Sequence, residues 1–167
     1  MTDRPLSHAI AEGDGISLVA LVSDAETARA AEANGAEAVA VVGDVASVRE
    51  ATNLPILCFW VSAGPDGIRH ADACVVRASD ADQIEAGENL ELALWVDDEE
   101  QLEGVLERFD PELLLLNGTF EKVLDLLADV PAGKLVIAEL HETTGEEFEE
   151  LERAGVDAVI VRDRELL

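Results

Sequence analysis

The stretch Ala36-Glu37-Ala38-Val39-Ala40-Val41-Val42-Gly43-Asp44 decides the fold, because the chain repeats it in outline at two later places. The same order, an acidic residue followed by an aliphatic run, returns in Ala71–Ala78 (ADACVVRA) and in Val156–Asp163 (VDAVIVRD). Each copy shows little polar alternation, which is typical of a parallel strand buried on both faces. The copies stand at alternate strands, so the predicted unit is strand–helix–strand–helix, used four times.

Eight aliphatic runs in all predict strands, and the amphipathic segments between them predict helices. The predicted strands are Ile16–Val22, Ala36–Val42, Leu54–Trp60, Ala73–Arg77, Leu90–Val96, Leu113–Leu116, Leu135–Leu140 and Ala158–Arg162. The predicted helices are Pro5–Ala11, Ala25–Asn34, Val45–Ala51, Pro65–Ala71, Ala81–Ala86, Glu99–Phe109, Thr119–Ala128 and Gly145–Ala154. Good N-cap residues precede three of them, at Ser23-Asp24, Asp97-Asp98 and Thr143-Thr144.

Strict alternation of strands and helices indicates a parallel α/β protein. Eight regular units favour a single compact (β/α)8 TIM barrel, whereas an open doubly wound sheet, the alternative, usually has about five or six strands. A barrel of this kind typically has about 250 residues, and this chain has 167. We therefore expect one domain over residues 1–167, with minimal loops and a short N-terminal segment, residues 1–15, before the first strand.

The charge balance is extreme, with 37 acidic against 11 basic side chains and a formal net charge of −26. Nucleic acid and anionic membranes both need a basic protein face, so neither is an expected partner. Self-repulsion of this size opposes folding at low ionic strength, and molar salt removes it by shortening the Debye length to about 3 Å. The composition resembles that of proteins from salt-in halophilic archaea, with an ordinary acidic mesophilic protein as the alternative.

The rest of the composition predicts a soluble cytoplasmic protein. Hydrophobic residues make up 49% of the chain, yet the apolar runs are strand-sized, so no membrane helix is expected. Residues 1–15 mix charged side chains and lack the apolar region of a secretory signal. The two cysteines, Cys58 and Cys74, fit a reducing compartment and are expected to be unreactive thiols buried on adjacent strands.

A family resemblance rests on three sets of segments: Ala38–Val42 with Val48–Leu57 (VREATNLPIL), Leu90–Glu100 (LELALWVDDEE), and Val136–Glu139 with Ala154–Val161 (AGVDAVIV). In this order they resemble the second and third strands, the fifth strand and the last two units of indole-3-glycerol-phosphate synthase, a barrel lyase of tryptophan biosynthesis. The resemblance covers most of the chain from Ser23 onward. It implies a phosphate-binding TIM barrel, here a shortened haloarchaeal-type member of that family.

The catalytic positions of that family are mostly changed here. Phe59 stands where the family has a lysine after its third strand, and Trp95 stands where it has a glutamate in its fifth. The family's Glu-x-Lys, Ser-Gly and Gly-Glu-Ser motifs are replaced in Leu18–Ser23, Leu140-His141 and Arg162-Asp163-Arg164. Because Phe59 cannot donate the proton that ring closure needs, we expect a relative without that activity, which binds a small phosphorylated metabolite.

Side chains at the C-terminal ends of the strands are the candidates for function, because barrel enzymes work at this face. Arg162 and Arg164 fall where the family holds a phosphate, and Arg77 ends another strand. Guanidinium groups bind phosphate bidentately, so these three arginines are candidate phosphate-binding residues. The alternative is that they pair with neighbouring carboxylates and hold an acidic rim together.

The candidate catalytic residues are Glu139, His141 and Asn117. Glu139 and His141 alternate along the seventh predicted strand, so they are expected to share a face, and Asn117 ends the sixth. Glu139 and His141 could act as an acid–base pair, or bind a cation together with Asp97 and Asp163. Alternatively, Glu139 belongs to a polar layer of the core and His141 begins the next helix. No metal and no other cofactor is predicted.

Trp60 and Trp95 are candidate stacking residues for a flat ligand, although large side chains also fill barrel mouths. Three functions therefore stay open. The first is a trimmed relative that binds a small phosphorylated ligand, and the second is an active lyase with a site rebuilt around Glu139, His141 and Asn117. The third is a non-enzymatic structural or interaction protein, because fold alone does not choose among functions.

Overall fold

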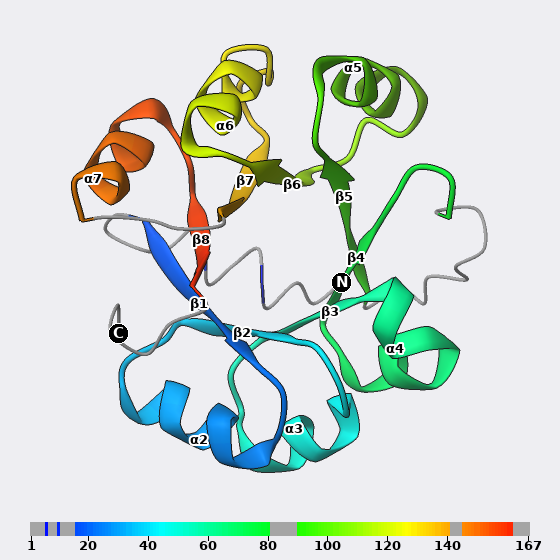
Figure 1. The fold of residues 1–167 in the computed structure, drawn as a ribbon. Coiled ribbons are helices and arrows are strands. Elements are labelled where there is room, and N and C mark those ends of the chain that lie inside the picture. The colour runs from blue at the N-terminus through cyan, green and yellow to red at the C-terminus, as the bar shows by residue number, and fades with distance from the viewer. Residues whose placement is uncertain (1–5, 7–9, 11–15, 81–89, 141–144, 162–167) are drawn as a thin grey trace.

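The computed structural model describes residues 6, 10, 16–80, 90–140 and 145–161. Eight parallel strands pair in chain order and close on themselves, because β1 (Ser17–Val22) bonds β2 (Ala38–Val41) on one side and β8 (Ala158–Val161) on the other. The helices lie around the outside of this closed sheet (Figure 1). The predicted (β/α)8 barrel is confirmed, and the open sheet is excluded.

The observed elements follow the predicted ones closely. The other strands are β3 (Ile56–Phe59), β4 (Ala73–Val76), β5 (Glu91–Val96), β6 (Leu113–Gly118) and β7 (Leu135–Leu140). The described helices are α2 (Ala25–Ala33), α3 (Val45–Ala51), α4 (Trp60–Gly67), the short 3-10 helix η1 (Ile68–His70), α5 (Glu99–Arg108), α6 (Phe120–Leu127) and α7 (Gly145–Ala154). None of them is long and apolar enough to cross a membrane.

Two of the predicted helices fall on residues that are wholly or mostly outside the described ranges. The segment predicted as a helix at Ala81–Ala86 lies outside them. Of the predicted Pro5–Ala11 helix, only Leu6 and Ile10 are described. Both are helical and buried among the side chains that fill the barrel.

Side-chain caps begin the helices immediately after the strands. The Asp24 carboxylate accepts a hydrogen bond from the Thr27 backbone N–H at 2.8 Å, and Asp98 accepts one from Gln101 at 2.7 Å. Thr119 caps α6 in the same way through its hydroxyl group. Because each cap satisfies an orphan N–H of the first turn, a helix starts without a long connection. The turns at these strand ends are therefore short, as expected from the chain length.

The clearest difference between the predicted and the observed elements lies between the third strand and the fourth. Trp60 was expected to end the third strand, but it is the first residue of α4, and β3 stops at Phe59. The weak helix expected at Pro65–Ala71 is also displaced, because α4 runs through Pro65 and passes directly into η1. The run Leu54–Trp60 is continuously apolar and contains no capping side chain, so its pattern does not mark where the strand becomes a helix.

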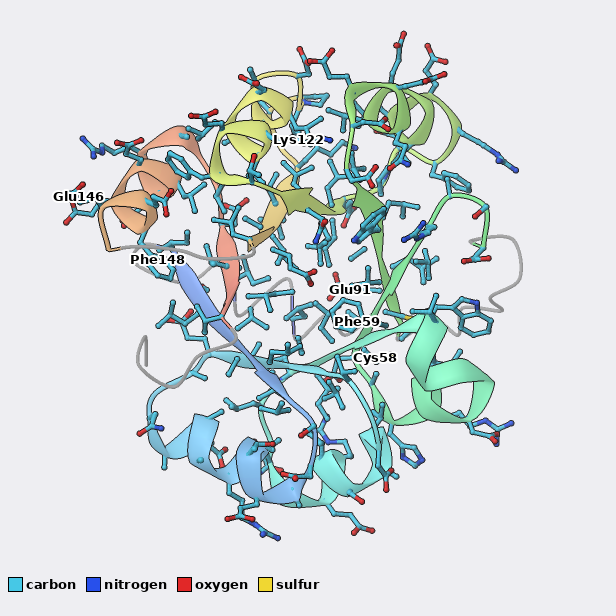
Figure 2. The ribbon with its side chains drawn as sticks, viewed as in Figure 1. Cys58, Phe59, Glu91, Lys122, Glu146 and Phe148 are labelled. Carbon is cyan, nitrogen blue, oxygen red and sulfur yellow. The ribbon has the colours of Figure 1, made fainter. Side chains whose placement is uncertain are left out.

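Alternate strand residues build two separate apolar layers. Inward side chains fill the barrel itself: Val19, Ala38, Ala40, Leu57, Ala73, Val75, Ala93, Leu113, Leu115, Ile137, Ala158 and Ile160, with Leu6 and Ile10. The intervening residues face outward and pack against buried helix residues such as Ala28, Leu102 and Leu126. This explains why the strands read as continuous apolar runs, since both faces are covered. Charged side chains such as that of Glu146 project outward from the helices (Figure 2).

The aspartate of the sequence repeat has a structural role at the start of β4 and β8. The Asp72 carboxylate accepts the Ile56 N–H at 2.9 Å, and the Asp157 carboxylate accepts the Val136 N–H at 2.8 Å. Each aspartate also donates its own N–H to the carbonyl of that same partner residue, at 2.9 Å in both cases. In two of its three copies, before β4 and before β8, the repeat therefore supplies a clamp between neighbouring strands at the N-terminal end of the barrel, whereas Glu37 of the first copy bonds the Leu18 carbonyl through its backbone N–H.

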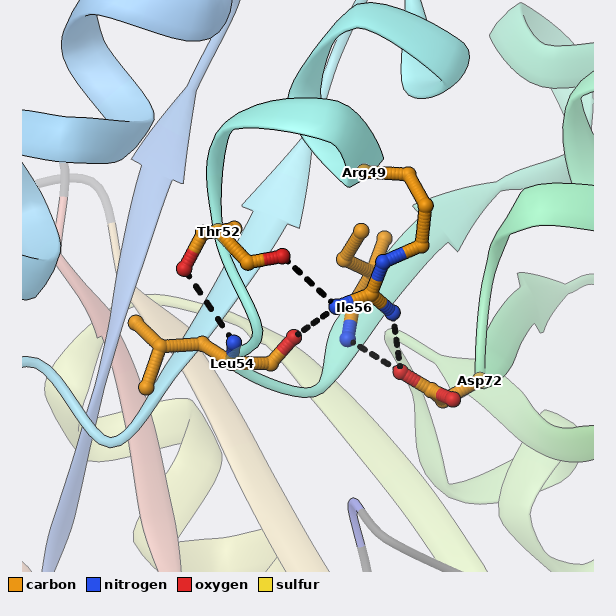
Figure 3. A network of polar contacts seen from close by, with 5 residues as sticks. All are labelled: Arg49, Thr52, Leu54, Ile56 and Asp72. Carbon is orange, nitrogen blue, oxygen red and sulfur yellow. Dashed lines mark hydrogen bonds and ion pairs between the residues drawn. The ribbon is translucent and has the colours of Figure 1, made fainter.

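Arg49 strengthens the first of these clamps (Figure 3). Its guanidinium group contacts Asp72 at 3.1 Å and donates to the Thr52 and Leu54 carbonyls at 2.8 and 3.0 Å. Three segments, the end of α3, the turn after it and the start of β4, are thus tied together. The arginine is placed for stability, consistent with the role of this end in barrels of this kind.

Cys58 and Cys74 lie directly opposite each other on β3 and β4, both fully buried and both unbridged. The expected placement on adjacent strands is confirmed. The thiol–thiol hydrogen bond with Cys58, together with burial, raises the pKa of Cys74.

Candidate functional site

The C-terminal mouth of the barrel continues the inward layer with polar and aromatic side chains. Phe59, Arg77, Trp95, Asn117 and Glu139 each come two positions after an inward core residue of the same strand. All five line one cavity of about 210 Å³. Figure 2 shows Phe59 inside the ring of strands, where it packs on the barrel core. Alternation along each strand is therefore what gathers these side chains at one place.

Glu139 and Asn117 form the polar pair of this cavity. They are register partners on β7 and β6, and the Asn117 amide Nδ2 donates to Glu139 Oε1 at 2.7 Å. Glu139 is only 9% exposed. The amide fixes one carboxylate oxygen, while Asn117 keeps its carbonyl oxygen and a second N–H for other contacts. A held carboxylate at a barrel mouth can accept a hydrogen bond or a proton from a bound molecule.

Arg77 and Trp95 form the second pair at this mouth. The guanidinium carbon of Arg77 lies 4.2 Å from the centre of the Trp95 ring, which is a cation–π contact. Arg77 itself is exposed, and Trp95 is half-buried. A cation–π contact uses no N–H donor of the guanidinium group, so these donors can still bind an anion bidentately. The indole thus holds the arginine in place and does not neutralise its charge.

Trp60 completes the wall of the cavity from α4. It is half-buried and lines the same cavity as Trp95. The next residue, Val61, also lines it and is 80% exposed. Both predicted stacking residues are therefore brought to one hollow, beside an apolar rim. Asp80 contributes a carboxylate to the same lining.

A second cavity, of about 340 Å³, adjoins the first and shares Arg77 and Trp95 with it. Its remaining lining is Ala78 and Ser79 after β4 and, from one face of α5, Gln101, Gly104, Val105 and Arg108. The spacing of these helix residues places them along one stripe of α5. Sequence reasoning missed this part of the site, because no motif in α5 indicates which residues meet the end of β4.

The structure brings together five of the predicted site residues: Asn117, Glu139, Arg77, Trp60 and Trp95. His141, Arg162 and Arg164 lie outside the described residues. In the ranges that are described, no three His, Cys, Asp or Glu side chains are grouped so that they could hold a metal ion. Phe59 and Asp80 also belong to the lining, and the parity of Phe59 on its strand could have shown that it points inward.

Comparison with known proteins identifies the fold of the chain but assigns it to no family. No family model matches the chain, and no curated protein sequence matches it. Phosphoenolpyruvate phosphomutase from Streptomyces platensis subsp. rosaceus superposes with a TM-score of 0.73 at 12% identity, over 99% of this chain and 82% of that one. N-acetylmannosamine-6-phosphate 2-epimerase from Clostridium perfringens gives 0.67 at 17% identity, over 87% and 86%. The 2,3-dimethylmalate lyase of the PEP mutase/isocitrate lyase superfamily gives 0.64 at 15%, over 96% and 81%.

These findings correct the resemblance drawn from the sequence. The similar solved structures are phosphonomutase, lyase and epimerase barrels, so assignment to the indole-3-glycerol-phosphate synthase family is wrong. The matching segments are aliphatic strands with their flanking turns, and the barrel architecture alone requires such segments. At these low identities the likeness is one of fold: the chain is a compact (β/α)8 TIM barrel similar to those of phosphonomutase, lyase and epimerase enzymes.

Proposed function

We propose that the barrel mouth binds a small phosphorylated metabolite, with Arg77 as the group that holds its anionic end. The observation that carries this proposal is the stacking of Arg77 on Trp95, at 4.2 Å, on the wall shared by two cavities. A chain with a net charge of −26 has few cations, and this one stands at the face where barrel enzymes bind their substrates. Two similar barrels are named for phosphorylated compounds, phosphoenolpyruvate and N-acetylmannosamine 6-phosphate.

The Asn117–Glu139 pair favours a second, chemical function for the same site. Glu139 is nearly buried and fixed by a 2.7 Å hydrogen bond from Asn117, which holds the carboxylate toward the cavity. A carboxylate held in this way acts as a general base, or as a general acid once it is protonated. The chemistry that needs one such group is proton transfer to or from a bound ligand. In this proposal Glu139 is the catalytic residue and Asn117 is a positioning residue.

Tryptophan fluorescence gives a direct test of ligand binding. The chain has two tryptophans and no tyrosine, and both tryptophans line the mouth cavity. We expect glycerol 3-phosphate, added at molar KCl to screen the distant carboxylates, to change the emission in a saturable way. Arg77→Ala is expected to abolish the change, whereas Arg69→Ala, which removes an exposed arginine from η1, is expected to leave it intact.

The opposite results would remove the proposal. If glycerol 3-phosphate, inorganic phosphate and N-acetylmannosamine 6-phosphate all leave the emission of the folded protein unchanged, the mouth does not bind phosphorylated metabolites. Equal binding by the Arg77→Ala and Arg69→Ala variants would show that the anion is held elsewhere.

A further inference from the structure

Cys58 and Cys74 lie within disulfide reach of each other. They are direct register partners on β3 and β4, and both side chains belong to the outer apolar layer, so they point to the same face of the sheet. Neighbouring strands lie about 4.8 Å apart, which is within the Cα separation of about 4.4–6.8 Å that disulfides span. A hydrogen bond already joins the two thiols. The sequence contains two cysteines, so each thiol has the other as its only cysteine partner in the chain.

The two thiols differ in acidity. The hydrogen bond from Cys74 lowers the pKa of Cys58, whereas the same contact together with burial raises the pKa of Cys74. Because the thiolate is the form that reacts with oxidants, Cys58 is the sulfur that reacts first. Cys74 then lies directly opposite it, in the position of a resolving thiol.

The helix that covers this pair has a low intrinsic stability. Both cysteines are fully buried, and α4, which with η1 connects β3 to β4, packs on both strands from outside (Figure 1). It has eight residues, and three of them, Gly64, Pro65 and Gly67, are poor helix formers. Phe59, the residue before it, offers no side-chain acceptor to cap its first turn. An element of this kind opens locally at a lower free energy than the whole barrel unfolds.

We propose that Cys58 and Cys74 are a reversible modification site, which hydrogen peroxide converts to a disulfide when α4 opens. In the first step the Cys58 thiolate attacks one peroxide oxygen, the O–O bond breaks, and Cys58 becomes a sulfenic acid. The hydroxide that leaves takes up the proton released by the Cys58 thiol and forms water. In the second step the Cys74 sulfur attacks the Cys58 sulfur and the S–O bond breaks, so the hydroxyl group leaves as water with the Cys74 proton.

The atoms and electrons of these steps balance. Two thiols lose two electrons and form one S–S bond, and one peroxide molecule is reduced to two water molecules. The inference does not depend on the proposed function, because it involves no ligand of the barrel mouth.

Peptide mapping of the oxidised protein tests the proposal. The folded protein is treated with dilute hydrogen peroxide at molar KCl, blocked with N-ethylmaleimide in urea and digested with trypsin. Cleavage after Arg49, Arg69 and Arg77 places the two cysteines in separate peptides, 50–69 and 70–77. We expect one mass that is two hydrogens below the sum of these peptides, and we expect dithiothreitol to separate them. Cys58→Ser and Cys74→Ser are expected to give no linked mass.

Gly67→Ala tests whether α4 controls access to the thiols. Gly67 is half-buried, and its φ of −67° and ψ of −38° are angles that alanine adopts without strain. Because alanine favours a helix over glycine, α4 should open less often and the linked peptides should form about fivefold more slowly. Gly104→Ala is the matched control, since it makes the same change in α5, where a Cβ meets nothing within 4 Å. It is expected to leave the rate of linking unchanged.

Three results would overturn the proposal. One is the recovery of both cysteines as maleimide adducts after peroxide treatment of the folded wild type. Another is oxidation of Cys58 to a sulfinic acid without a link to Cys74. The third is a dimer on a non-reducing gel, which would show that the link forms between chains. If Gly67→Ala and Gly104→Ala link as fast as the wild type, α4 is not the route by which peroxide enters, and that part of the proposal is wrong.

Discussion

Replacing Arg49 by alanine removes the best-defined polar network of the barrel, and its cost can be worked out from the contacts. The side chain makes an ion pair with Asp72 at 3.1 Å and two bonds to the Thr52 and Leu54 carbonyls, at 2.8 and 3.0 Å. The two charged side chains are 30% and 24% exposed, so water partly screens the pair and it contributes about 0.5–1 kcal/mol. The two carbonyl bonds add about 1 kcal/mol each.

The expected loss of unfolding free energy is therefore about 2–3 kcal/mol. For a protein of this length that corresponds to a fall of roughly 4–12 °C in the melting temperature. Urea unfolding followed by circular dichroism, at one fixed KCl concentration, measures it directly. Arg69→Ala is the matched control, because it makes the same charge change at an exposed site and is expected to cost less than about 0.5 kcal/mol.

A double-mutant cycle with Asp72→Asn separates the contributions. Asparagine keeps an oxygen that accepts the Ile56 N–H, so this variant removes the charge and leaves the strand clamp. The coupling between Arg49→Ala and Asp72→Asn should be about 0.5–1 kcal/mol, less than half of the Arg49→Ala effect. The reasoning is refuted if Arg49→Ala is no more destabilising than Arg69→Ala, or if the coupling accounts for the whole loss.

Three further predictions concern pH, thiols and salt. Burial raises the pKa of Asp157, and the hydrogen bond from the Val136 N–H lowers it by a smaller amount. The folded state therefore holds this proton more tightly than the unfolded chain does. As a result, the folded protein loses stability as the pH rises through the raised pKa. In urea unfolding, Asp157→Asn should therefore have a larger free energy of unfolding than the wild type at pH 7. This difference should disappear below about pH 4, near the unperturbed aspartate pKa. A difference that stays constant with pH contradicts the prediction. Cys58 and Cys74 are fully buried, so a maleimide should label neither in the folded protein and both in urea, and labelling of the folded protein at the rate of a free thiol would be inconsistent with the barrel packing. The net charge of −26 predicts a melting temperature that rises between about 0.1 and 2 M KCl as repulsion is screened, and a fall over that range would contradict the halophilic interpretation.

Much of the fold could be predicted from local patterns in the sequence. The helices α3 and α7 have the predicted bounds, Val45–Ala51 and Gly145–Ala154. Strand ends, capping residues and the following apolar run mark these bounds, and all of them are local signals. The alternation of eight strands with helices was sufficient to predict closure. The start of α4 at Trp60 was not predictable, because no capping residue marks it. Packing against the barrel decides where that helix begins.

The candidate site was only half predictable, for a related reason. Glu139 and Asn117 could be placed together because both end strands that are adjacent in chain order. The second cavity, which is lined by Arg77, Ser79 and one face of α5, depends on which stripe of that helix faces the end of β4. This contact is non-local and has no sequence motif. Arg108 was therefore overlooked, although α5 itself was predicted. The family assignment failed because the resemblance came from strand segments, which any barrel of this type contains, and the residues that carry chemistry differed.

Arg49 and Lys134 at the N-terminal end of the barrel and Arg77 at the C-terminal end are held in different ways, and this difference supports the proposed binding site. At the N-terminal end, Arg49 pairs with Asp72 and Lys134 with Asp110, so these two cations are each matched by a carboxylate and contribute to stability. At the C-terminal end, Arg77 stacks on an aromatic ring, which orients a guanidinium group without cancelling its charge. Among the described residues Arg77 makes no ion pair with a carboxylate, in contrast to Arg49. The proposed binding of an anion at the mouth would account for a cation kept on a ring beside a cavity, so Arg77 is the first residue to change in a binding experiment.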